Sequence, residues 1–195
     1  MKARFVSILI QSGDGMETKQ EKIARLQKKR SDFLALKERD RLRQSFGKEI
    51  VGAISEKIGR ELSLDDFKLD VNLPFDFKWN NEKHNMEGLV ASCINRTAAN
   101  EILRCIREKI SLLSGTAWFQ DKPYLGSAKL NEVDPVHLLE IADATNDSIV
   151  FFSDDLGGVI MVDCYKSQPD EPYSVVVQGD KFVLAVGNCF FVRKD

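Results

Sequence analysis

The stretch from residue 147 to residue 163 constrains the fold of this chain more than any other part. Apolar residues, mostly β-branched and aromatic, fill positions 149–152 and 159–162, and Asp154-Asp155-Leu156-Gly157-Gly158 separates the two runs. Apolar runs of this length around a short Asp/Gly turn indicate two antiparallel strands joined as a hairpin. Gly157 and Gly158 are expected to supply the positive φ angles that such a turn requires.

More runs of the same kind follow toward the end of the chain. Five strands are expected, at residues 148–153, 159–165, 173–178, 181–186 and 189–193. Several of them are apolar at successive positions, which is typical of strands buried on both faces. The sequence therefore predicts an α+β fold, with a mostly antiparallel β-meander sheet at the C-terminal end and helices packed on it.

The earlier part of the chain has the spacing of helices. Apolar residues three, four and seven apart predict helices at residues 17–46, 48–62 and 97–113, the last with Asn95 or Thr97 as its N-cap and Ser114-Gly115 as its end. Asp134-Pro135 predicts the start of another helix, which reaches about residue 142. Alternating runs at 67–71 and 75–79 predict a hairpin, and shorter strands are expected at 116–119 and 124–130.

The first predicted helix differs from the rest of the chain in charge. Residues 17–46 contain ten Lys/Arg and five Asp/Glu, and because the whole chain has a net charge of −2, the remainder carries −7. Gly47 is only a weak helix breaker, so residues 17–62 form either two helices or one bent helix. We expect a leader and long basic amphipathic helix at 1–46, and a single α+β domain at 47–195.

The four cysteines, Cys93, Cys105, Cys164 and Cys189, have no spacing typical of a metal or redox site. An apolar or aromatic residue directly follows each of them, so we expect buried thiols in a reducing compartment. No apolar run approaches the roughly 18 residues that a membrane span needs. The expected location is the cytoplasm, with no membrane partner.

The sequence contains no motif for catalysis. There is no glycine-rich phosphate loop, no zinc-protease helix and no nucleophile elbow, and only two histidines are present. Neither enzymatic activity nor a cofactor is therefore expected. Asp154, Asp155 and Asp163 could approach a hard cation, but the chemistry of a tight turn explains these residue types without a metal.

The hairpin stretch also carries a resemblance to a known family. Residues 148–163, followed by Pro172-Tyr173-Ser174-Val175-Val176-Val177-Gln178-Gly179-Asp180, resemble the sheet region of the SUKH superfamily. In that superfamily an apolar strand ends in a polar Asp/Gly turn, the next strand carries an acid, and a further strand leads to a short polar turn. Many bacterial members are immunity proteins that bind and neutralise toxins, often nucleases. The resemblance implies a non-enzymatic toxin inhibitor.

Two kinds of partner are left open by the charge pattern. Acidic residues in or beside the turns of the meander are expected to engage a basic protein partner, a toxin; they are Asp154, Asp155, Asp163, Asp170, Glu171 and Asp180. Alternatively, the basic helix contacts nucleic acid through Lys28, Lys29, Arg30, Arg39, Arg41 and Arg43. Acidic residues interrupt this basic run, so a solvated helix face also explains it.

Overall fold

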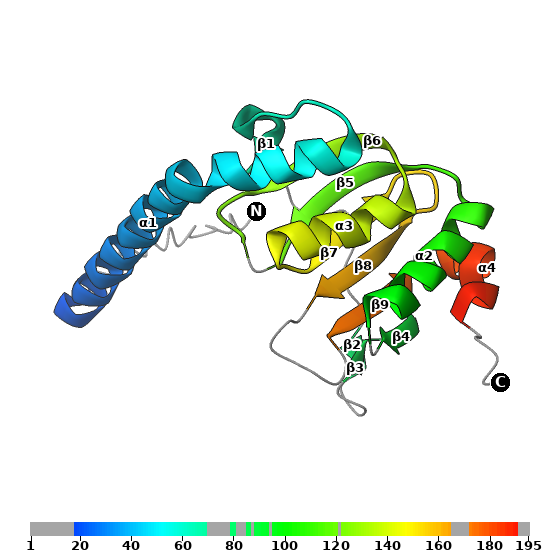
Figure 1. Ribbon diagram of the computed structural model, residues 1–195. Helices are drawn as coiled ribbons and strands as arrows, with labels where there is room; N and C mark the ends of the chain where they lie inside the picture. Colours follow the sequence, from blue (N-terminus) through cyan, green and yellow to red (C-terminus); the bar gives the residue numbers. More distant parts are fainter. Residues whose placement is uncertain are drawn as a thin grey trace, which may run out of the picture. The chain divides into compact units, whose positions relative to one another are not determined.

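The computed structural model describes residues 18–69, 79–80, 85–86, 88–93, 95–120, 122–164 and 172–190 (Figure 1). The chain forms two compact units, which divide between Arg39 and Asp40. This division precedes the predicted boundary at residue 46, because side chains of the long helix already contact the sheet domain before Gly47. We call the second unit, from Asp40 onward, the body. No helix within the described residues combines the length and the apolar character that crossing a membrane requires.

Helices separate groups of two to four strands along the described chain. The helices are α1 (Lys19–Ile58), η1 (Leu64–Asp66), α2 (Arg96–Lys109), α3 (Pro135–Thr145), α4 (Asp180–Val186) and η2 (Gly187–Phe190). The strands are β1 (Phe67–Lys68), β2 (Trp79–Asn80), β3 (Asn85–Met86), β4 (Leu89–Cys93), β5 (Leu113–Phe119), β6 (Ser127–Val133), β7 (Ile149–Ser153), β8 (Gly158–Cys164) and β9 (Tyr173–Gln178).

Seven strands form one sheet in the order β1-β6-β5-β7-β8-β9-β4, and every neighbouring pair is antiparallel. The strands β7, β8 and β9 follow one another directly, as the apolar runs around the Asp/Gly turn predict. The predicted α+β fold, with an antiparallel sheet near the C-terminal end and a long N-terminal helix, is confirmed. A separate pair, β2 and β3, is also antiparallel.

The main core lies between the sheet and its helices. The helices α2, α3 and α4 and the C-terminal part of α1 contribute buried side chains to one cluster with the strands, and Figure 1 shows α2 and α3 side by side across one face of the sheet. The opposite face carries a second apolar cluster, formed by Val150, Val159, Met161 and Val176. Residues of described helices do not contribute to this second cluster. Strands β7, β8 and β9 are thus buried on both faces, as expected.

The helix α1 begins at a capping box and continues through Gly47. The Glu21 carboxylate accepts hydrogen bonds from Thr18 N and Thr18 Oγ1, and Glu21 N donates to Thr18 Oγ1, so two exposed donors at the helix start are satisfied. The bond from the Thr18 backbone lowers the pKa of Glu21. Gly47 is buried, and a Cβ there would lie 2.7 Å from Leu64 Cδ2. Close packing rather than a helix stop explains this glycine.

The helices α2 and α3 begin where the sequence predicts. Asn95 Oδ1 accepts from Ala98 N at 2.9 Å, which decides between the two N-cap candidates. Asp134 caps α3, with Pro135 in its first turn. The end of α2 was predicted too late, because Leu113 already begins β5 and Ser114-Gly115 belong to that strand.

The last two predicted strands are wrong. Residues 180–186 form the helix α4, which buries Phe182 and Val186 and leaves Leu184 88% exposed. Residues 187–190 form the short helix η2, and residues 191–195 lie outside the described residues. A short apolar run fits a strand or a buried helix equally well by periodicity, and here the packing of Phe182 and Val186, four positions apart, favours the helix.

The strands before α2 also differ from the prediction. Phe67 in β1 pairs with Ala128 of β6, while Trp79 in β2 pairs with Met86 of β3. The predicted pairing of 67–71 with 75–79 falls largely on residues 70–78, outside the described residues. The strand β4 was not predicted, and it forms the sheet edge beside β9. Its sequence, Leu89 to Cys93, has only two large apolar residues and gives little periodic signal.

Two of the four cysteines are paired. Cys105 in α2 and Cys189 in η2 form a disulfide, with Cα atoms 5.5 Å apart and a sequence separation of 84 residues. The expectation of four thiols is therefore wrong for this pair, whereas Cys93 and Cys164 are buried thiols outside the disulfide. The bond ties the C-terminal helices to α2. Disulfides are rare in cytosolic proteins, so this one does not support the expected cytoplasmic location.

Candidate functional site: an acidic end of the sheet

The turn between β7 and β8 presents two of the predicted acidic residues. Asp154 and Asp155 are exposed, and Asp154 N donates to Ser114 O at 3.0 Å, which attaches the turn to the start of β5. Gly157 has φ +58°, as predicted, and its position favours glycine. Gly158 instead lies in β8, where a Cβ would approach Gln178 O to 2.3 Å. Strand proximity, rather than a positive φ angle, therefore requires glycine at 158.

The end of β9 lies directly beside this turn. Val159 pairs with Gln178, and a Cβ on Gly179 would lie 2.7 Å from Gly158 Cα. Gly179 has φ +104°, and Asp180 follows it as the first residue of α4 and is exposed. The structure thus brings Asp180 to the same end of the sheet as Asp154 and Asp155.

A fourth carboxylate at this end was missed by the sequence analysis. Glu132 is exposed near the end of β6 and has φ +56°, an unfavourable conformation for a residue with a side chain. Its backbone N–H donates to Ser114 Oγ at 3.1 Å, within a bulge where Asn131 and Glu132 of β6 lie opposite Ser114 of β5. Non-glycine residues at positive φ often mark functional sites. Such a conformation depends on strand pairing, so the sequence contained no signal for it.

We call Glu132, Asp154, Asp155 and Asp180 the acidic rim. Lys129 of β6 forms an ion pair with Asp154, and Lys181 is exposed next to Asp180. Both partners of the ion pair are largely exposed, so the pair contributes little to stability. Among the described residues at these strand ends, the four carboxylates outnumber Lys129 and Lys181 and leave a net negative charge.

The other predicted acidic residues do not extend the rim in the described chain. Asp163 is only 4% exposed, and its Oδ2 accepts a 2.5 Å hydrogen bond from Ser174 Oγ of the paired strand β9. Asp163 is therefore not part of an acidic surface, and its role is to link two strands. Asp170 and Glu171 lie outside the described residues.

The six basic residues of α1 differ in their surroundings. Lys28, Lys29 and Arg30 are exposed, as is Arg41, whereas Arg39 and Arg43 are half-buried. The Arg43 guanidinium donates to four backbone carbonyls of the body, those of Leu64, Phe67, Tyr124 and Leu125. Arg43 therefore anchors α1 to the body and is not available to a phosphate, contrary to the prediction.

A partly buried polar cluster links α2, α3 and the sheet. Asp143 accepts hydrogen bonds from Tyr173 Oη at 2.8 Å and Cys164 Sγ at 3.5 Å, and it pairs with Arg96. Burial, together with the bond to Asp143, raises the pKa of Tyr173, so its phenol stays protonated at neutral pH. A protonated phenol and a thiol that both donate to one carboxylate form a structural link and are not activated nucleophiles.

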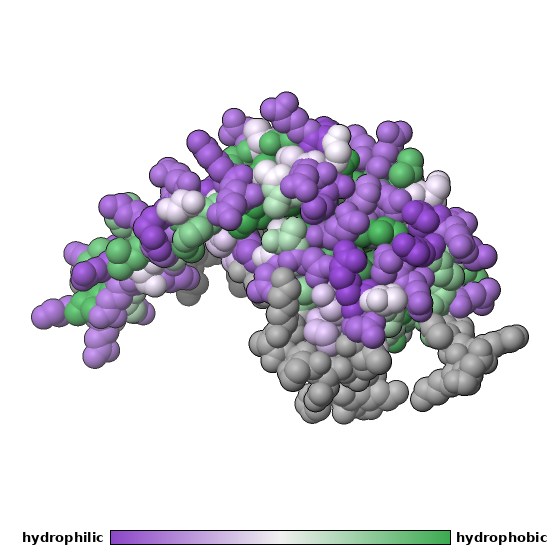
Figure 2. All heavy atoms as spheres, viewed as in Figure 1, coloured by the Kyte–Doolittle hydropathy of each residue, from purple (hydrophilic) through white to green (hydrophobic). Residues whose placement is uncertain are grey.

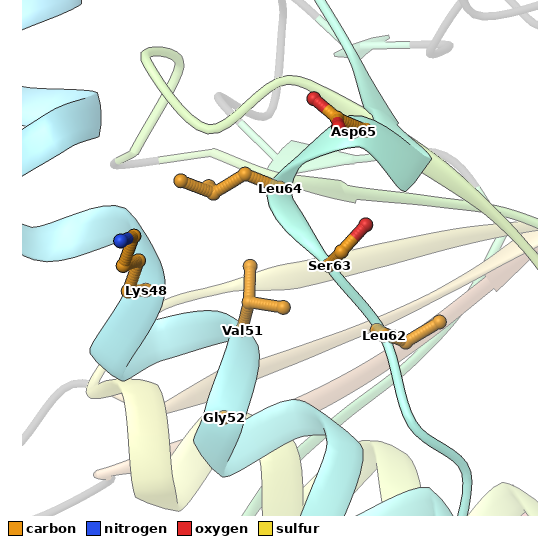
Figure 3. A pocket seen from close by; sticks show the side chains of 7 residues that line it. All are labelled: Lys48, Val51, Gly52, Leu62, Ser63, Leu64 and Asp65. Atoms are coloured by element: carbon orange, nitrogen blue, oxygen red, sulfur yellow. The ribbon is translucent and has the colours of Figure 1, made fainter.

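The body also has a surface hollow of about 520 Å³, where the C-terminal part of α1 faces the segment at 62–65 (Figure 3). The side chains of Val51 and Leu64 point into it, and Lys48, Ser63 and Asp65 are its polar members. A second hollow, of about 440 Å³, is lined by Lys57, Arg96, Glu140, Asp143 and Ala144. Opposite charges balance in both hollows, one lysine and one aspartate in the first, and two cations and two carboxylates in the second. Neither hollow therefore has the converging charge that would hold an ionic ligand.

Within the described ranges, no three His, Cys, Asp or Glu side chains are grouped closely enough to hold a metal ion. In particular, Asp163 is buried between strands and does not join Asp154 and Asp155. No protein-family model, curated protein or solved structure matches this chain.

Proposed function

We propose that the body is a non-enzymatic protein-binding module, most concretely an immunity-type inhibitor that binds and neutralises a bacterial toxin. The observation that carries the proposal is the acidic rim, in which the ends of β6, β7 and β9 hold four exposed carboxylates at one end of the sheet. The resemblance of residues 148–163 and 172–180 to the SUKH sheet region supports the same class of function.

The rim suits a basic protein partner for two physical reasons. Its carboxylates lie on strand ends and tight turns. Backbone hydrogen bonds and close glycine contacts hold these segments in place, so little backbone conformational entropy is lost on binding. Clustered charge of one sign also steers a partner of opposite sign and raises the association rate. In the partly buried polar cluster around Asp143, the carboxylate accepts from Tyr173 and Cys164 and pairs with Arg96, so these residues form a structural link without a substrate.

The cytoplasm remains the proposed compartment, because Cys93 and Cys164 are buried thiols, as expected in a reducing compartment. The Cys105–Cys189 disulfide counts against it.

Co-purification from the native host, followed by measurement of binding kinetics, tests the proposal. The variant Glu132→Lys/Asp155→Lys changes two rim residues that cap no helix, and it should slow association of the captured partner by about tenfold at low salt. The difference should shrink as salt screens the charges. The control is Glu101→Lys/Glu108→Lys, which makes the same change in net charge on exposed positions of α2.

Equal association rates for the rim variant and the α2 control would contradict the proposal. Capture of nucleic acid without protein would favour the alternative, in which the exposed Lys28, Lys29 and Arg30 contact phosphates.

A further inference from the structure

The first unit exposes large apolar side chains along its helix. Between Lys19 and Arg39 five of them are 46–55% exposed: Ile23, Leu26, Phe33, Leu34 and Leu36. Figure 2 shows hydrophobic and hydrophilic residues interleaved on this part of α1. Single apolar residues on a surface are ordinary, but five large ones between Ile23 and Leu36 of one helix indicate an interaction surface.

Three of these side chains follow the heptad spacing of a helix that pairs with another helix. Ile23, Leu26 and Phe33 lie three and seven residues apart, so they share one stripe of the helix. Arg30 and Lys37 occupy the same stripe, seven and fourteen residues after Ile23. The Lys37 ammonium lies 4.8 Å from the centre of the Phe33 ring, which confirms that these two residues share a face. We call the set Ile23, Leu26, Arg30, Phe33 and Lys37 the basic stripe.

A second copy of this chain is a poor match for the basic stripe. In a parallel pair, Arg30 and Lys37 would each face their own counterpart, and like charges at core positions repel. The helix segment 19–39 carries eight Lys/Arg and three Asp/Glu, so two copies would also repel in the antiparallel orientation. The charge of the stripe therefore calls for an acidic partner.

Nucleic acid satisfies the charge but not the apolar part of the stripe. Phosphate contacts use cations, and bases stack on aromatic rings, whereas Ile23 and Leu26 gain little from either. We propose that the basic stripe docks against an acidic amphipathic helix of another protein, with aliphatic side chains packed on Ile23, Leu26 and Phe33, and Asp or Glu opposite Arg30 and Lys37. This surface lies in a different unit from the acidic rim and has the opposite charge, so the inference does not depend on the proposed function.

The full chain and two synthetic helical peptides test this inference. Both peptides carry leucine at the core heptad positions; one has glutamate opposite the two cations, and the other has lysine there. Fluorescence anisotropy should show that the chain binds the glutamate peptide at least about tenfold more tightly than the lysine peptide. The variant Arg30→Glu/Lys37→Glu should reverse this preference, because the charges across the pair are exchanged.

The apolar contribution is tested separately with Leu26→Ala/Phe33→Ala, which keeps a strong helix former at both positions. This variant should bind the glutamate peptide at least about tenfold more weakly. The matched control is Leu112→Ala, since Leu112 is 50% exposed but lies in the body. Leu112→Ala should leave the affinity unchanged.

Three results would overturn the inference. The first is an unchanged affinity of Leu26→Ala/Phe33→Ala for the glutamate peptide, which would reduce the interaction to charge alone. The second is tighter binding of random duplex DNA than of the glutamate peptide at the same salt concentration. The third is a dimer of the unmodified chain in sedimentation equilibrium that Leu26→Ala/Phe33→Ala dissociates, because a second copy would then occupy the stripe.

Discussion

The two parts of α1 have similar residues and opposite roles. Ile23 is 46% exposed in the first unit, whereas Ile54 is completely buried in the body. Arg30 is exposed, whereas Arg43 donates to four carbonyls of the body. One continuous helix therefore has a surface that is open to solvent before Arg39 and a packed surface after Asp40.

This difference shows that helical periodicity identifies the helix but not the use of its apolar stripe. Isoleucine and leucine recur at similar spacing in both parts, and only the presence of a sheet domain beside the second part decides that its stripe is buried. The first part keeps its helical conformation with the help of its capping box and strong helix formers. Substitutions of identical residues in the two parts measure this contrast directly.

The largest contrast is expected between the two isoleucines. Ile54→Ala should lower the free energy of unfolding of the body by about 3–4 kcal/mol, because it leaves a cavity in a closely packed core. Ile23→Ala should change it by less than about 0.5 kcal/mol, since Ile23 is exposed. Urea unfolding followed by tryptophan fluorescence, to which Trp118 in β5 contributes, measures both. Equal effects would mean that the stripe before Arg39 is buried in solution.

A smaller contrast is expected between the two arginines. Arg43→Ala should destabilise the body by about 2–3 kcal/mol, because it removes charge-assisted hydrogen bonds and leaves partly buried carbonyls without donors. Arg43→Lys should recover only part of this loss, since an ammonium cannot reproduce the geometry of the guanidinium fork. Arg30→Ala should have no measurable effect on urea unfolding. A stable Arg43→Ala protein would show that the body does not need this anchor.

The smallest contrast concerns two glycines within the packed part of α1. Gly52→Ala should stabilise the helix by about 0.5–1 kcal/mol, because a Cβ there meets nothing within 4 Å. Gly47→Ala should lose that gain and destabilise by up to about 1 kcal/mol, since its Cβ would lie 2.7 Å from Leu64 Cδ2. Thermal unfolding resolves the difference in sign. If Leu64 causes the penalty, Leu64→Ala should make the Gly47→Ala change favourable.

The residues of the candidate site also differ in how far local sequence predicts their surroundings. The acidic turn at Asp154 and Asp155 was predictable, because Asp and Gly in a short loop between apolar runs are a local signal. The burial of Asp163 was not predictable. Because β8 is buried on both faces, its sequence does not alternate between apolar and polar residues and gives no sign of which side chains are exposed. Glu132 lies in a bulge of β6, where Asn131 and Glu132 are opposite Ser114 of the neighbouring strand β5, and no local pattern encodes this bulge.

The sequence by itself determined the elements whose signals lie within a few residues. Asn95 and Asp134 mark the starts of α2 and α3, and the apolar runs of β7, β8 and β9 appear at their correct places. Caps, turns and periodicity depend on backbone groups close in the chain, so they survive without knowledge of the fold.

Only the tertiary structure decided how distant segments use similar residues. The apolar run 182–186 became a helix because Phe182 and Val186 pack together on the core, and Cys105 meets Cys189 across 84 residues. Arg43 became an anchor because four carbonyls from separate segments converge on it. In each case the free energy comes from burial and hydrogen bonding between segments far apart in sequence, and such partners leave no trace in local spacing.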